Sequence, residues 1–332
     1  MRISSACVVL GVLLLAGGCR VEERMVWSPD GARAAVRLPD GLCLMDASGV
    51  LSPPVASNVL AVAWLPDSQG LVLLRQIPMT NWPDAARLLP PEETAIVEAL
   101  TRGMVDVLKG ALVAAGGDAA AVSEKFLKPL KIESPDKFIP IALCLHDTQT
   151  TALRQIIQGA RNAGDWEKFL TNSFEINVNE LSILHLKDGR TNGTPQLLER
   201  TLDDLAEPRP SPTAPVVAFL RRNSLTVVPL NGGTNRICVT DKTAGSYDWT
   251  PDGKSLVYPV RLTGEWEPDA INLVRIERRV AVDAAGALIA GDVLPLALAG
   301  VTFTPRVRCL PDGQVLFASL ALQLPEIGRA HV

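Results

Sequence analysis

Trp27-Ser28-Pro29-Asp30-Gly31 is the stretch of this sequence that decides its fold class. Pro29 presets φ at the second position of a tight turn, and Asp30 suits the third position, where its carboxylate can accept hydrogen bonds from backbone amides. Gly31 takes the positive φ that follows. Apolar residues lie immediately before and after the stretch. We therefore expect two short strands joined by this turn.

The turn recurs along the chain. Complete or weakened copies stand at Trp64-Leu65-Pro66-Asp67, Ser211-Pro212-Thr213, Trp249-Thr250-Pro251-Asp252-Gly253 and Leu310-Pro311-Asp312-Gly313. Pro29 and Pro66 lie 37 residues apart, and Pro212 and Pro251 lie 39 apart, close to the period of about 40 to 45 residues that four-stranded propeller blades show. The two remaining spacings are 146 and 60 residues, which predicts insertions of about 106 and about 20 residues.

The repeated chemistry of these turns has a structural explanation. Their aspartates could be mistaken for catalytic or metal-binding carboxylates, but they occur one per repeat, each in a turn position. We therefore assign a structural role to the repeat-turn residues, which are Pro29, Asp30, Gly31, Pro66, Asp67, Pro251, Asp252, Gly253, Pro311, Asp312 and Gly313.

The first unit predicts one complete blade. Its four strands, from innermost to outermost, are expected at 25–27, 33–38, 42–46 and 50–55. These residues resemble the TolB-type propeller repeat, in which a Trp-Ser-Pro-Asp-Gly turn joins the two inner strands. The copy at Ser211 departs from that pattern because it lacks Trp, Asp and Gly, and the copy at Leu310 has Cys309 in place of the aromatic residue.

The resemblance covers residues 24–75 and about 176–325. It implies an all-β fold, an incomplete β-propeller with about four to five blades present and an α-helical insertion in the second blade. A β-sandwich that uses similar turns is the alternative.

The N-terminus, residues 1–18, is expected to be a lipoprotein signal peptide. Arg2 supplies the positive start, and the apolar run that follows is too short to span a bilayer. Ala16-Gly17-Gly18-Cys19 resembles the bacterial lipobox, which implies that Cys19 is diacylated and anchors the mature protein to the membrane. Arg20 stands where an Asp would favour retention at the inner membrane, so we expect the periplasmic face of the outer membrane. An ordinary secretory signal is the alternative.

Residues 77–175 are predicted to be a helical insertion between propeller segments 19–76 and 176–325. Pro90-Pro91-Glu92-Glu93 is typical of a helix start, because proline suits the first turn and acidic residues favour the positive end of the helix dipole. One apolar face follows, formed by Ile96, Leu100, Met104, Leu108 and Leu112. Gly116-Gly117 ends this helix, and Asp118 can cap a second one reaching Lys128.

The position of the insertion suggests a binding face. It separates the second and third strands of its blade, and so does the shorter insertion at 263–270. Loops of that kind emerge on one face of a propeller, so we expect a lid or docking platform there. Trp82 and Trp266, which lie outside the repeat, are the candidate residues of this face. The alternatives are burial of these tryptophans and helices that merely cover their own apolar face.

The last seven residues, Glu326 to Val332, resemble a translated sequencing adapter. We therefore expect the natural sequence to correspond to this one only as far as Pro325, and the true gene to continue.

No sequence motif for catalysis, phosphate binding or dinucleotide binding is present. His146 and Asp147 could form an acid–base pair, but a helix boundary also explains the aspartate, and His185 lies in an alternating strand. Without Arg2, 31 basic residues stand against 36 acidic ones with no dense basic cluster, which argues against a nucleic-acid partner. We expect no catalytic residue, no cofactor and no metal.

These features favour a membrane-anchored envelope lipoprotein whose propeller binds or scaffolds a protein partner in the cell envelope. One alternative is the propeller of a prolyl-oligopeptidase-like serine peptidase whose hydrolase domain is missing. The other is a sensor for a small molecule or a glycan.

Overall fold

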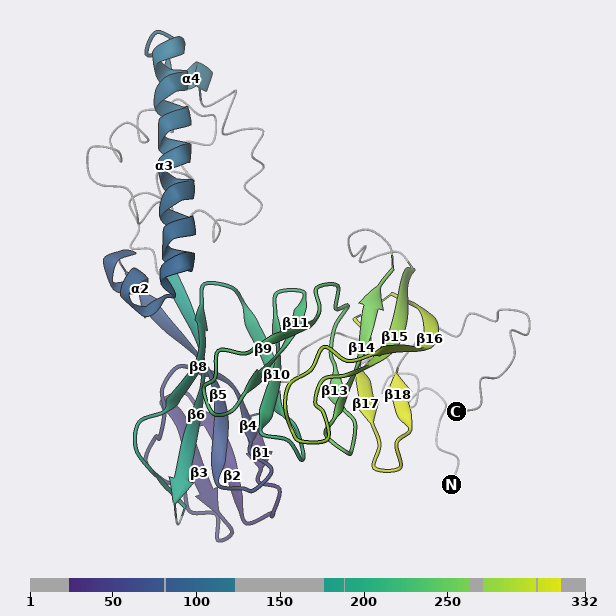
Figure 1. Ribbon diagram of the computed structural model, residues 1–332. Coiled ribbons are helices and arrows are strands. Elements are labelled where there is room, and N and C mark those ends of the chain that lie inside the picture. Colours follow the sequence, from purple (N-terminus) through teal and green to yellow (C-terminus); the bar gives the residue numbers. More distant parts are fainter. Residues whose placement is uncertain are drawn as a thin grey trace, which may run out of the picture.

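The computed structural model describes residues 24–80, 82–122, 176–187, 189–262, 271–302 and 304–317. Strands are the commonest secondary structure of these residues, and they form five antiparallel sheets that follow one another along the chain and lie side by side (Figure 1). The all-β class predicted from the repeated turns is therefore confirmed. Within the described part of the chain, helices occur only between β5 and β6.

Each sheet is built from strands that are consecutive in sequence. The first sheet contains β1 (Met25–Trp27), β2 (Arg33–Leu38) and β3 (Gly41–Asp46). The second contains β4 (Val59–Trp64), β5 (Gly70–Met79), β6 (Ile176–Lys187), β7 (Arg190–Thr191) and β8 (Gln196–Thr201). The third contains β9 (Leu205–Pro210), β10 (Val216–Arg221), β11 (Ser224–Pro229) and β12 (Ile237–Thr240).

Two further sheets complete the described part of the chain. The fourth contains β13 (Asp248–Trp249), β14 (Ser255–Arg261), β15 (Asn272–Val280) and β16 (Val293–Val301). The fifth contains β17 (Val307–Cys309) and β18 (Val315–Phe317). In the third and fourth sheets the strands pair in sequence order, so each is a four-stranded meander.

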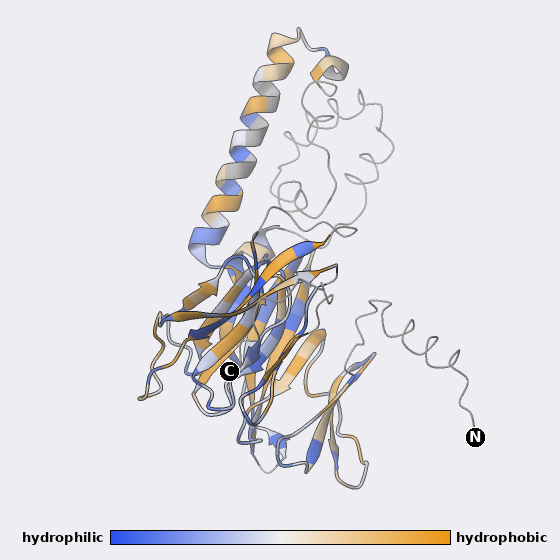
Figure 2. Cartoon of the chain, turned by 90° about the vertical axis from the view of Figure 1, so that its right-hand side faces the viewer, coloured by the Kyte–Doolittle hydropathy of each residue, from blue (hydrophilic) through white to orange (hydrophobic). Residues whose placement is uncertain are grey.

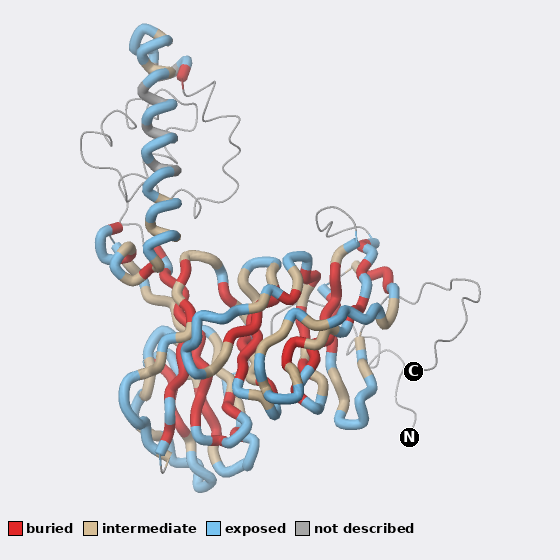
Figure 3. Tube along the Cα trace, in the orientation of Figure 1, coloured by how far each residue is buried: buried red, intermediate tan, exposed pale blue. Residues whose placement is uncertain are grey.

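The apolar core is divided among the interfaces between neighbouring sheets. Each interface is one cluster of buried side chains: Leu42 with Leu71, Leu74 with Phe219, Val227 with Tyr258, and Val257 with Val307. The second strand of the fourth sheet, β14, is buried along nearly its whole length because sheets pack against both of its faces. Figure 3 shows this burial concentrated in the middle strands.

The prediction of an outermost strand at 50–55 in the first unit is wrong. Two isolated bridges, Met45 with Leu51 and Leu42 with Ala56, replace it. The reason is local, because Pro53 has no amide to donate to a ladder and stands next to a second proline.

The helices leave the sheets at one end of β5. They are α2 (Trp82–Leu88), α3 (Pro91–Ala114) and α4 (Ala119–Val122). The 24-residue helix α3 projects away from the sheets (Figure 1) and carries a mixture of apolar and polar residues along its length (Figure 2). It begins at Pro91 as predicted and ends before Gly116 and Gly117, which take φ of +61° and +86°.

The strands on either side of the helices remain paired. Met79 at the end of β5 faces Ile176 at the start of β6, so the insertion separates the second and third strands of its sheet, as predicted. Residues 263–270 connect β14 and β15 in the same way. In the described part of the chain, no helix combines the length and apolar character needed to cross a bilayer.

Candidate functional site

The repeat-turn aspartates bond to their own turns. Asp30 Oδ1 accepts from the Ser28 hydroxyl at 2.5 Å and from the Ala32 amide at 3.0 Å. Asp252 Oδ1 makes the matching bonds to the Thr250 hydroxyl at 2.6 Å and the Lys254 amide at 3.1 Å. These hydrogen bonds favour the charged carboxylates, so the pKa of each aspartate lies below its ordinary value.

The other two turn aspartates follow the same pattern. Asp67 accepts from the Gln69 amide at 2.8 Å, and Asp312 accepts from the Gln314 amide at 2.9 Å. Among the described residues, no group of His, Cys, Asp or Glu side chains could hold a metal ion. The geometry of these carboxylates is that of turn closure.

Two repeat tryptophans join neighbouring sheets. Trp64 Nε1 donates to the carbonyl oxygen of Val26 at 2.8 Å, and Trp249 Nε1 donates to that of Arg209 at 2.9 Å. Val26 and Arg209 occupy equivalent positions, each two residues before the serine of the preceding turn. Each tryptophan therefore ties its own sheet to the first strand of the sheet before it.

The helical face is anchored by Trp82. This side chain is 5% exposed and packs with Ala85, Leu89, Ile176 and Val178 against the ends of β5 and β6. Its indole nitrogen donates to Glu98 of α3 at 3.3 Å. Trp82, proposed from sequence as part of a binding face, thus lies inside the joint between helices and sheet, as the burial alternative states.

A second anchor holds the first turn of α3. Glu93 Oε1 accepts from the Thr201 hydroxyl at 2.8 Å and from the Leu202 amide at 3.0 Å. These bonds tie the start of the helix to the end of β8 in the second sheet. Further along α3, Val107 and Val113 are exposed by 57% and 81%. The helix therefore starts from a fixed base and presents apolar side chains beyond it.

Buried carboxylates and arginines continue from that base along the second sheet. Glu180, nearly buried, forms ion pairs with Arg75 and Arg200 from the strands on either side of β6. Burial raises the carboxyl pKa, but the hydrogen bonds from the two arginines outweigh it, so the pKa of Glu180 is lowered.

A neighbouring network links the second sheet to the third. Arg221 of β10 pairs with Glu199 at 3.4 Å and with Asp203 at 2.7 Å. Arg236 also pairs with Glu199, at 3.0 Å. Arg221 donates to the same Thr201 hydroxyl that contacts Glu93, at 3.0 Å. The network connects the third sheet, the second sheet and α3 through one chain of hydrogen bonds.

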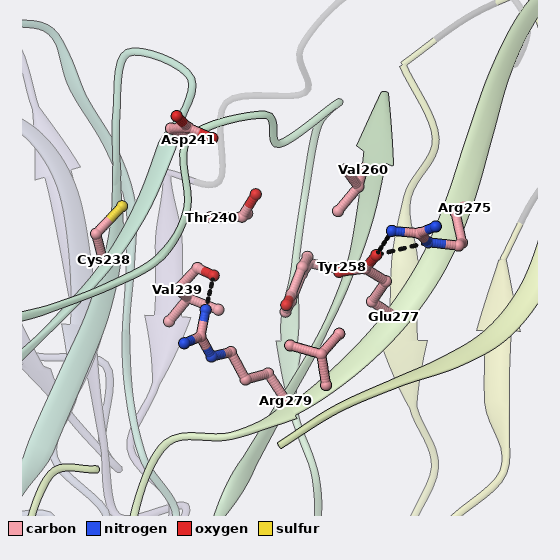
Figure 4. Close-up of a pocket in the computed structure, with 10 residues that line it drawn as sticks. Cys238, Val239, Thr240, Asp241, Tyr258, Val260, Arg275, Glu277 and Arg279 are labelled. Atoms are coloured by element: carbon pink, nitrogen blue, oxygen red, sulfur yellow. Dashed lines mark hydrogen bonds and ion pairs between the residues drawn. The ribbon is translucent and has the colours of Figure 1, made fainter. Parts of the chain in front are cut away.

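A cavity of about 520 Å³ lies between the third and fourth sheets. Its walls come from β12 on one side and from β14, β15 and β16 on the other (Figure 4). Tyr258, Glu277 and Arg279 project toward it from the fourth sheet, and Cys238 stands on the other wall. Its volume is within the range of small-molecule sites, but it opens widely to solvent.

Several residues proposed from sequence lie outside the described part of the chain. They are Cys19, Trp266, His146 and Asp147. His185 is described and exposed, and its ring nitrogen Nε2 lies 3.3 Å from the amide oxygen of Gln196.

Comparison with known proteins identifies no family. A scan against protein-family models finds no match, and a search of curated protein sequences finds none either. Among solved structures, one described as a TolB protein from Agrobacterium tumefaciens matches with 12% sequence identity and a TM-score of 0.29. The match covers 88% of this chain and 87% of that one. A TM-score this low supports no inference about the fold or function of this chain.

The ion-pair networks and the cavity were missed by sequence reasoning. Glu180 and Arg200 lie on strands that the helical insertion separates from Arg75 in sequence. The available signal was an acidic residue with apolar neighbours inside a strand, such as Glu180 before Leu181 in β6. A charged residue inside a strand buried on both faces requires a partner.

Proposed function

We propose that this chain is the propeller part of an exported, lipid-anchored envelope protein that binds another protein through its helix-bearing face. The observation that carries the propeller assignment is the repeated contact between sheets. Trp64 and Trp249 make the same indole-to-carbonyl hydrogen bond to equivalent positions of the preceding sheet. A stack of meander sheets with equivalent neighbour contacts is the arrangement of propeller blades.

The binding role is supported by the projecting helix. The base of α3 is fixed by Glu93 and Trp82, whereas Val107 and Val113 are exposed apolar residues away from the base. These valines are accessible to a partner protein, and the fixed base holds the helix that presents them.

Site-specific photo-crosslinking in intact cells tests the binding role. A photoreactive residue at Val107 should yield one defined protein adduct. The matched control is Leu316 on β18, which is 52% exposed and far from α3 along the chain. The same adduct pattern from both positions, or no adduct from Val107, would contradict the proposal.

Fractionation tests the anchor separately. Replacing Cys19 with alanine should release the protein from membranes, because the lipid would have no attachment point. Retention of the variant in the membrane fraction would refute the anchor while leaving the binding role open. Resequencing past the codon for Pro325 tests the peptidase alternative, which a downstream Gly-x-Ser-x-Gly motif would favour.

A further inference from the structure

The cavity between the third and fourth sheets contains a guanidinium without a carboxylate partner. Arg279 Nη1 donates to the carbonyl oxygen of Val239 at 2.5 Å, which fixes the side chain across the sheet interface (Figure 4). Its Nε is buried and has no hydrogen-bond partner among the described residues. Within the same part of the chain, Arg279 forms no ion pair with Asp or Glu. Its positive charge is therefore held in place but not neutralised.

Tyr258 supplies a second unused polar group. Its side chain is fully buried, and it lines the cavity from β14. The hydroxyl lies beside Glu277, its cross-strand neighbour, yet it makes no hydrogen bond of ordinary geometry with the residues that the structure describes. Burial, together with the Glu277 charge, raises the pKa of Tyr258 well above its ordinary value. The hydroxyl therefore stays protonated and can donate.

Among the described residues that line the cavity, Arg279 is the cation without a carboxylate partner. Glu277 is neutralised by Arg275, whose Nε donates to it at 2.6 Å. Asp241 lies at the end of the cavity away from the Arg279 guanidinium (Figure 4). The rest of the wall includes three apolar side chains, which are Val239, Val260 and Val293.

We propose that this cavity binds a small organic acid, with the ligand carboxylate between the Arg279 guanidinium and the Tyr258 hydroxyl and an apolar body against the three valines. A carboxylate would neutralise the arginine through a charge-assisted hydrogen bond and would accept a hydrogen bond from the tyrosine hydroxyl. The Arg279 Nε and the Tyr258 hydroxyl have no hydrogen bond to lose among the described residues, and Arg279 Nη1 keeps its bond to the Val239 carbonyl. This site is separate from α3, so it goes beyond the protein-binding role proposed above.

Calorimetric titration of the purified full-length chain with hexanoate tests the site, with hexanol as the uncharged comparison. Hexanoate should bind saturably, and hexanol should bind more weakly. Arg279→Gln should weaken hexanoate binding about tenfold or more, as expected for loss of a hydrogen bond to a charged group. Absence of saturable hexanoate binding at millimolar concentration, or equal binding of hexanol, would overturn the proposal.

The neighbouring arginine provides the matched control. Arg278 is exposed, and alternation along β15 directs it to the opposite face from Arg279. Arg278→Gln removes the same charge and should change the affinity by no more than about twofold, because an exposed distant charge is screened. Equal losses in both variants would mean that only net charge matters, and the site would be rejected.

Tyr258→Phe separates a binding role from a structural one. A buried hydroxyl without a partner contributes no stability, so the variant should unfold at the same temperature as the wild type or higher. Its affinity for hexanoate should nevertheless fall about fivefold to tenfold. A lower unfolding temperature with unchanged affinity would show that the hydroxyl supports the fold and would remove it from the site.

Discussion

The turns at Trp27–Gly31 and Trp249–Gly253 have nearly the same sequence but different neighbours. Both close with a hydroxyl-to-aspartate hydrogen bond, of 2.5 Å in the first and 2.6 Å in the second. Trp27 is 51% exposed, however, whereas Trp249 is 6% exposed and bonded to the preceding sheet.

The glycines of the two turns show the same difference. A Cβ added at Gly31 would meet no atom within 4 Å, but one added at Gly253 would lie 2.3 Å from Thr213 Oγ1. The weakened copy at Ser211–Thr213 supplies that contact. The same local sequence thus forms the same turn in both places, and its contribution to stability depends on whether another sheet packs against it.

The largest difference is expected at the tryptophans. Trp249→Ala should lower the free energy of unfolding by about 3 to 5 kcal/mol, because it leaves a cavity in the interface and an unpaired Arg209 carbonyl. Trp27→Ala should cost about 1 kcal/mol or less, since that side chain is already half exposed. Urea denaturation of both variants measures the two values, and equal losses would break the comparison.

Alanine at the two glycines should give the next largest contrast. Both glycines have positive φ, +69° at Gly31 and +66° at Gly253, so either substitution should cost about 1 to 2 kcal/mol in backbone strain. Gly253→Ala should cost about 2 kcal/mol more because its Cβ overlaps Thr213 and Ser211. Thermal unfolding of the two variants tests this, and a larger loss at Gly31 would contradict it.

Ser211→Ala should have a smaller effect. Ser211 is fully buried, and its hydroxyl donates to the Gly253 carbonyl at 2.8 Å and accepts from the Ala214 amide at 3.1 Å. Loss of these bonds should cost about 1 to 3 kcal/mol. Combined with Gly253→Ala, the total loss should be less than the sum, because removing the hydroxyl relieves part of the overlap. Simple additivity in urea denaturation would show that the two turns do not contact each other.

The smallest effect concerns pH, and it should be alike in both turns. The pKa values of Asp30 and Asp252 are lowered from 3.8, mainly by the Ser28 and Thr250 hydroxyls. A lowered folded-state pKa contributes stability that is fully present above 3.8 and is lost as the pH falls below it. Asp30→Asn and Asp252→Asn should therefore destabilise at pH 7, and the deficit should shrink below pH 3.8. Urea midpoints across this pH range measure the stability deficit of each variant. A deficit that grows at low pH would contradict the prediction.

Sequence reasoning located most of the inner strands, because each repeat turn encodes its own φ requirements. The strand at 33–38 was predicted with its observed bounds, and the helix beginning at Pro91 was found from its start signal. The last strand of the fourth sheet behaved differently. Strand β16 was missed, since its apolar run has no turn motif before it.

The candidate sites were less predictable. Trp82 stood out in sequence because it lies outside the repeat, but the same position between helix and sheet buries it. Arg279 and Tyr258 gave no such signal, as an arginine and a tyrosine in strands are ordinary. They matter because, among the described residues, Arg279 has no carboxylate partner and the Tyr258 hydroxyl has no hydrogen bond. Both features depend on how β12 packs against the fourth sheet.

The sequence by itself determined the turns, the strands they join, the helical start at Pro91 and the separation of β5 from β6 by an insertion. These depend on φ preferences, capping and apolar spacing within a few residues. The tertiary structure decided which repeat tryptophans are buried, how Glu180 and Glu199 are neutralised, and where an unneutralised Arg279 faces a cavity. Those features depend on contacts between residues far apart in the chain, which no local pattern specifies.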